Sequence, residues 1–144
     1  MRNSNNADEI ASALLYKSGV AMVGGDYELF RSCFSLPNYI ETSEGARILE
    51  TEAAFREAFS IVRSKYEEND VTDMARTVLS AELLATGIIG STHASQLITS
   101  GGSEFCKPFP VYSTIVNIDG CWKVASSTYV ILDFPALNAA LVQS

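Results

Sequence analysis

The chain has 144 residues, of which 47% are hydrophobic and 19% charged, and its formal net charge is −7. This length predicts a single domain over residues 1–144, large enough to bury about two thirds of its unfolded surface. Because no run of lysine or arginine interrupts the negative charge, we expect neither nucleic acid nor a membrane surface as a partner.

The cysteines and the N-terminal residues bear on metal sites and localisation. Cys33, Cys106 and Cys121 are odd in number and far apart, which argues against a disulfide framework. A zinc site needs clustered cysteine or histidine ligands, and the chain has one histidine, so we expect no metal. Residues 1–9 are polar, and neither a long apolar run nor a phosphate-binding motif follows. The sequence therefore predicts a cytoplasmic protein with reduced thiols and no cofactor.

Two helices are expected in the first part of the chain. Asp8 is suited to cap a first helix, whose apolar residues recur at helical spacing until Gly24-Gly25 ends it. Asp26 is suited to cap a second, short helix. Pro37 is expected to end that helix, because the residue before a proline disfavours the α conformation.

A hairpin and a third helix are expected next. Residues 38–49 have the pattern of two short strands that turn at Glu44-Gly45. Thr51 is suited to cap a long helix in which apolar residues three or four positions apart form one stripe. The stripe consists of Phe55, Phe59, Val62 and Tyr66.

The second half of the chain has the pattern of β-structure. Four strands are expected, at Val71–Ala85, Ile88–Ile98, Val111–Ile118 and Trp122–Leu132, with a helical tail at Ala136–Val142. Asp119-Gly120 tolerates the positive φ angles of a tight hairpin turn. Helices followed by antiparallel strands indicate an α+β fold, with the helices on one face of the sheet.

The first of these hairpins allows the strand faces to be predicted. If Thr86-Gly87 is a two-residue turn, Leu84 pairs with Ile89 and Ser80 with His93. This register places His93 on the outer face, where apolar residues stand among polar ones. The apolar residues are Val78, Leu84, Ile89 and Leu97. A sheet face exposed to water is usually polar, so we expect this face to form a homodimer.

Several segments together resemble the NTF2-like superfamily, in particular its SnoaL-like branch. They are Gly25-Asp26 with Phe30 and Phe34, Tyr39-Ile40-Glu41-Thr42 before Gly45, Thr51-Glu52-Ala53-Ala54-Phe55, and Asp119-Gly120-Cys121-Trp122-Lys123-Val124. The resemblance covers residues 8–132. It implies a cystatin-like cone, in which a curved sheet wraps a long helix and encloses a pocket.

The same resemblance implies where catalytic groups of a ketosteroid isomerase would lie. The corresponding positions carry Ser18, Thr42 and Thr114, or Ser113 if the loop register shifts. None of these hydroxyls can accept a proton at neutral pH, and the neighbouring Glu41 points to the opposite face of its strand. Isomerase chemistry of that kind is therefore disfavoured.

Other chemistries of the superfamily depend on three further residues. A dehydratase mechanism would rest on His93, a weak catalytic candidate because it is expected on the outer face. An epoxide hydrolase would pair Asp73 with Arg76, but residues three apart on a strand point to opposite faces. We therefore expect Arg76 to be a salt-bridged surface residue.

Aromatic residues with polar tips are the candidates for contact with a ligand. Tyr16, Tyr39 and Trp122 could line the rim of an apolar pocket and orient a small apolar molecule. Two functions stay open. One is an isomerase, cyclase or dehydratase acting on a small apolar or aromatic compound. The other is a non-catalytic binding or assembly subunit, comparable to the small β subunit of aromatic-ring-hydroxylating dioxygenases.

Overall fold

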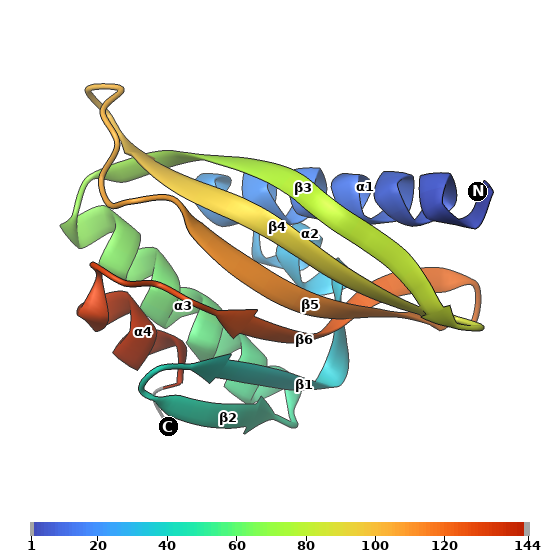
Figure 1. Ribbon diagram of the computed structural model, residues 1–144. Coiled ribbons are helices and arrows are strands. Elements are labelled where there is room, and N and C mark those ends of the chain that lie inside the picture. Colours follow the sequence, from blue (N-terminus) through green and yellow to red (C-terminus); the bar gives the residue numbers. More distant parts are fainter. Residues whose placement is uncertain (1, 143–144) are drawn as a thin grey trace.

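The computed structural model describes residues 2–142 of the chain, and its elements follow the expected order of helices and then strands (Figure 1). The helices of this part are α1 (Arg2–Gly24), α2 (Tyr27–Ser32), α3 (Glu52–Glu68) and α4 (Pro135–Leu141). The strands are β1 (Phe34–Thr42), β2 (Gly45–Leu49), β3 (Val71–Ala85), β4 (Ile88–Thr99), β5 (Phe109–Ile118) and β6 (Cys121–Tyr129).

A single sheet in the order β2-β1-β6-β5-β4-β3 curves around the helices (Figure 1). Helix α1 runs along β3, and α4 packs against both α3 and β1. Helix α3 contacts β2 and β3, which are the two edge strands of the sheet. One helix can touch both edges only because the sheet is strongly curved, so the α+β cone expected from the sequence is confirmed.

Local sequence signals account for the starts of α2 and α3, whereas Asp8 does not cap α1 as predicted, because that helix already begins at Arg2 and contains Asp8. The Asp26 carboxylate accepts a hydrogen bond from Leu29 N at 3.1 Å, and the Thr51 hydroxyl accepts one from Ala54 N at 3.1 Å. Both residues are therefore the N-caps that the sequence predicts. The apolar stripe of α3 is also confirmed, since all four of its members are buried: Phe55, Phe59, Val62 and Tyr66.

The final hairpin also forms as expected. Asp119 has φ 53° and Gly120 has φ 87°, and they connect β5 to β6. Two consecutive positive φ angles match the right-handed twist of the flanking strands, which is why Asp-Gly occurs at this turn.

Pro37 does not end a helix, contrary to the expectation. Helix α2 already stops at Ser32, and Pro37 lies within β1, after a cis peptide bond. The pairing of β1 with β6 is irregular between Phe34 and Tyr39, and a proline, which has no N–H to donate, is tolerated at such an irregularity. The β1–β6 pair is parallel, so the sheet is mixed rather than wholly antiparallel.

The register of the β3–β4 hairpin differs from the prediction, and the faces are reversed. Irregularities in β3 pair Leu83 with Ile89 and Val78 with His93, because each extra residue shifts the register by one. Ile89, His93 and Leu97 have exposed fractions of 1%, 2% and 1%, so they face the helices. The predicted outer position of His93 and the predicted dimer contacts of Ile89 and Leu97 are therefore wrong.

Within residues 2–142, no helix combines the length and apolar character needed to cross a bilayer.

Candidate ligand cavity

A cavity of 90 Å³ lies between the sheet and the helices. Its walls come from all four described helices and all six described strands, and most of the side chains are apolar. The largest of the apolar ones are Phe30, Phe34, Phe55, Phe59, Leu97 and Phe109. For comparison, an engineered cavity of about 150 Å³ binds benzene, so this one suits a molecule with a smaller apolar body.

One end of the cavity is polar, and the sheet register explains why. Arg76 on β3 pairs with Ser95 on β4, and both line the cavity. Ser127 and Tyr129 on β6 line it from the other side, as does Ser18 of α1. A smaller cavity of 20 Å³ shares Ser18, Arg76, Ser127 and Tyr129 with the first and includes His93. The polar groups of α1, β3, β4 and β6 thus gather where the two cavities meet.

Arg76 is the charged group at this end. Its Nη1 donates to Leu15 O at 3.2 Å and to Ser18 Oγ at 3.0 Å, while its Nη2 lies 3.4 Å from His93 Nε2. Gly19 allows this approach of α1, since a Cβ there would lie 3.4 Å from Arg76 Nη1. Burial lowers the pKa of Arg76, yet an arginine keeps its proton in proteins. The expected surface salt bridge is absent, because Arg76 forms no ion pair with any described carboxylate.

His93 is neutral in this environment. Its pKa is lowered to about 3, first by burial and then by the positive charge of Arg76. A neutral imidazole can accept the Arg76 N–H at Nε2. At neutral pH, a group with so low a pKa is a weak base and an ineffective proton donor.

The other titratable groups of the cavity are phenols. Burial raises the pKa values of Tyr66 and Tyr129, so both hydroxyls keep their protons at neutral pH. None of the described residues that line either cavity is Asp or Glu. Nor do any three His, Cys, Asp or Glu side chains of the described part lie close enough together to hold a metal ion. The cavity can therefore bind through hydrogen bonds, apolar contact and one positive charge.

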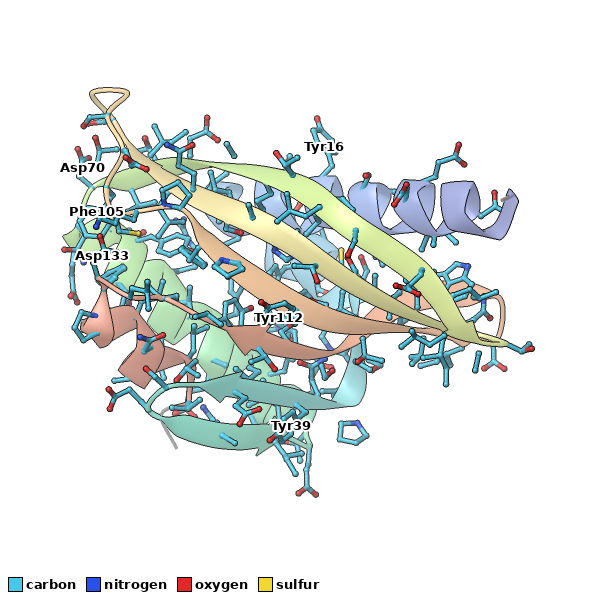
Figure 2. The ribbon with its side chains drawn as sticks, in the orientation of Figure 1. Tyr16, Tyr39, Asp70, Phe105, Tyr112 and Asp133 are labelled. Atoms are coloured by element: carbon cyan, nitrogen blue, oxygen red, sulfur yellow. The ribbon has the colours of Figure 1, made fainter. Side chains whose placement is uncertain are left out.

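The structure does not bring the three predicted aromatic residues to this cavity. Tyr16 of α1 is 76% exposed, and Tyr39 of β1 is 39% exposed on the outer side of the sheet (Figure 2). Trp122 is partly buried against a separate cluster, which consists of Ala7, Ala11, Leu14, Cys33, Ala81, Ile89 and Ile115. None of the three lines either cavity.

Of the positions that correspond to catalytic groups of a ketosteroid isomerase, some line a cavity and others do not. Ser18 lines the cavity, whereas the Thr42 hydroxyl donates to Asn138 O at 3.0 Å and lies outside it. Thr114 lines neither cavity, and its neighbour Ser113 lines the smaller one beside His93. Glu41 is exposed, as strand alternation predicts.

Sequence reasoning missed Arg76, Ser95 and Ser127 as cavity residues. A signal for Arg76 was present, since strand alternation places it on the same predicted face as His93. Because that face was predicted to be the outer one, both residues were excluded together. The serines give no sequence signal of their own, and only the sheet register brings them together.

Comparison with known proteins supports the fold. No family model and no curated protein matches the sequence. Among solved structures, the chain is similar to an NTF2-like protein of unknown function from Shewanella oneidensis MR-1, with a TM-score of 0.68 and 11% identity. That match covers 85% of this chain and 97% of the other.

Two further structures give the same result. An NTF2-like protein with a cystatin-like fold from Novosphingobium aromaticivorans has a TM-score of 0.67 and 14% identity, over 96% of this chain and 90% of that one. A ketosteroid isomerase-like protein from Erwinia carotovora atroseptica has a TM-score of 0.63 and 12% identity, over 90% and 99%. The chain therefore has the NTF2-like, cystatin-like fold that its sequence segments resemble.

Proposed function

We propose that this protein binds a small, largely apolar molecule in the cavity between its sheet and helix α3. The observation that carries the proposal is the 90 Å³ cavity itself, whose walls are mostly aromatic and aliphatic side chains. Well-packed proteins have few voids larger than a water molecule, because lost contacts destabilise the fold. A ligand that fills the space would restore those contacts.

The polar end of the cavity favours a single orientation of the bound ligand. Ligand sites are typically apolar with a few convergent polar groups that fix the direction of the ligand. Here Ser18, Arg76, Ser95 and Ser127 supply such groups, and Asn38 adds a further polar side chain to the lining. The apolar remainder would receive the body of the molecule.

The groups present favour binding over acid–base catalysis. An isomerase, cyclase or dehydratase needs a side chain that exchanges a proton near neutral pH. His93 is the sole histidine, its pKa is about 3, and no described carboxylate lines the cavity. A non-catalytic binding or assembly subunit is the alternative that best fits these groups, and catalysis on a small apolar compound remains the second candidate, resting on His93 alone.

Calorimetric titration with neutral molecules of suitable size tests the proposal. Cyclopentanol and pentanamide should bind the wild-type protein and raise its unfolding temperature. Ala58→Leu fills the cavity from α3 and should abolish this binding, whereas Ala53→Leu adds the same atoms to an exposed position of the same helix and should leave it intact. Equal binding by Ala58→Leu and wild type would contradict the proposal.

A further inference from the structure

The guanidinium of Arg76 has hydrogen-bond donors without partners. Arginine carries five N–H groups. The contacts with Leu15 O, Ser18 Oγ and His93 Nε2 use three of them, and Nε is shielded from solvent with no partner in the described structure. An unsatisfied buried donor costs free energy, and more so on a charged group.

The positive charge is also uncompensated. Asp73 borders the same α1–β3 groove as Arg76, but it forms no ion pair with Arg76, and its carboxylate accepts from Met74 N at 2.8 Å. His93, the nearest titratable partner, is neutral. A buried charge is stable when it is paired, and removing one partner of a buried pair is strongly destabilising. Arg76 is half-buried and no described carboxylate offsets its charge, so an anion at this end of the cavity would be stabilised.

The edge left free has the geometry that a carboxylate needs. Nε–H and one of the two N–H groups of Nη2 lie along one edge of the planar guanidinium; Nε–H has no partner among the described residues, and Nη2 has one N–H besides the one that contacts His93. A carboxylate can accept from this edge with both oxygens, in the bidentate pairing typical of arginine. Ser95 and Ser127, each 5% exposed, border the same cavity and can donate further hydrogen bonds.

The remaining walls restrict the rest of the ligand. Beyond the polar end they are aromatic and aliphatic except for Asn38, whose amide donates to Ser35 O and Val124 O. The volume of 90 Å³ is below that of the benzene-binding cavity used for comparison. The formal net charge of −7 opposes anions at a distance, so recognition depends on this local group.

We propose that the ligand is a small monocarboxylate with an apolar body, its carboxylate bound by Arg76 and its body enclosed by the aromatic wall of the cavity. This inference rests on the proposed function and specifies the chemical class of its ligand.

Binding of matched pairs of ligands tests the preference for a carboxylate separately from the proposed binding of apolar molecules. Pentanoate and pentanamide have the same body and differ in charge, as do butanoate and butanamide. The wild-type protein should bind each carboxylate about 10-fold more tightly than its amide, the ratio expected for hydrogen bonds to a charged group. Equal affinities would overturn the inference and leave the proposed function standing. Binding of neither kind would overturn both.

Variants assign the preference to Arg76. Arg76→Met keeps the length and apolar stem, and it should lose the preference for carboxylates while still binding the amides. Lys65→Met removes a cation from the surface of α3 and should keep the full preference. A preference for carboxylates that survives in Arg76→Met would overturn the inference.

NMR spectroscopy of the wild-type protein also tests whether Arg76 binds the carboxylate. This measurement replaces the variant if Arg76→Met does not fold. The NMR signal of Arg76 Nε–H should move further on addition of pentanoate than on addition of pentanamide, because a carboxylate accepts a stronger hydrogen bond from a cation than an amide oxygen does. An Nε–H signal that responds equally to both ligands, or to neither, would overturn the inference.

Discussion

The protonation state of His93 depends on its burial and on the neighbouring charge of Arg76. Both ionise readily in water, and both lie at the meeting point of the two cavities. Burial together with the charge of Arg76 keeps His93 neutral, with a pKa of about 3. The neutral imidazole in turn accepts a hydrogen bond from Arg76 without adding charge.

This coupling predicts the pH dependence of stability. In the unfolded chain His93 binds a proton below about pH 6.5, whereas in the folded chain it binds one only below about pH 3. Between these values the unfolded state holds more protons, so the free energy of unfolding should fall by up to about 1.4 kcal/mol per pH unit as the pH drops. Neither Arg76 nor Tyr129, which face His93, titrates in this range.

Urea denaturation of wild type and His93→Gln between pH 7 and pH 4 measures this contribution. Exposed carboxylates affect both proteins equally, so the difference between the two curves isolates His93. The wild-type stability should fall more steeply than that of His93→Gln. Parallel curves would mean that His93 is accessible and titrates normally.

The partial burial of Trp122 predicts how much its removal destabilises the protein. Its side chain is partly buried against a cluster that α1 shares with several strands, outside the main core. Trp122→Ala should therefore destabilise the protein by about 2 kcal/mol, less than the roughly 3–5 kcal/mol typical of a fully buried aromatic. Tyr16→Ala removes an aromatic ring that is 76% exposed, so it should change the free energy of unfolding by less than about 0.5 kcal/mol. Denaturation curves of both variants would check this, and equal losses would contradict it.

At the scale of elements, local chemistry predicted helices better than strand faces. The caps Asp26 and Thr51 and the stripe of α3 depend on residues within a few positions, and all are confirmed. The face of β3 depends on irregular pairing with β4, which no short sequence pattern reveals. Strand alternation grouped Arg76 and His93 on one face correctly, but that face was assigned to the outside because the opposite face has more apolar residues.

The N-cap of α3 allows a direct test of this local account. Thr51→Ala removes the acceptor of the Ala54 N–H and should destabilise the protein by about 1 kcal/mol, whereas Thr51→Ser keeps an acceptor and should cost much less. Helix α3 forms one wall of the cavity. If the loss of the cap in Thr51→Ala makes the start of α3 fray, the affinity of that variant for cyclopentanol should fall together with its stability. Thermal unfolding that does not distinguish the two variants would argue against the cap.

At the scale of the whole molecule, we still expect the outer sheet face to form the dimer interface. Of the four apolar residues first predicted there, Leu84 is 61% exposed, whereas Ile89 and Leu97 are buried and Val78 is partly buried against an inner cluster. Tyr39 and Ile48 pair across β1 and β2, and with Tyr112 of β5 they are 39%, 54% and 48% exposed (Figure 2). Four neighbouring positions on β4, β5 and β6 are small and uncharged, namely Thr92, Thr114, Ser126 and Thr128, whereas Glu41 of β1 places a carboxylate beside Thr128. A stable dimer here would bury more than about 1,000 Å² in total.

Light scattering at micromolar concentration tests the dimer. The wild-type protein should have the mass of two chains, and Tyr112→Arg should give a monomer because it places a charge in the interface. Leu132→Arg alters a residue that is 83% exposed and lies beyond β6, so it should remain dimeric. A wild-type monomer would contradict the prediction.

The central claim, that a small molecule occupies the cavity, is tested most directly by NMR of labelled methionine and alanine methyl groups during titration with cyclopentanol. Met22, Met74 and Ala58 line the cavity, and Ala53 is exposed on the outer side of α3. The account predicts that the signals of the three lining methyl groups shift together and saturate, while that of Ala53 stays fixed. Unchanged signals from the lining methyl groups, or shifts as large at Ala53, would contradict it.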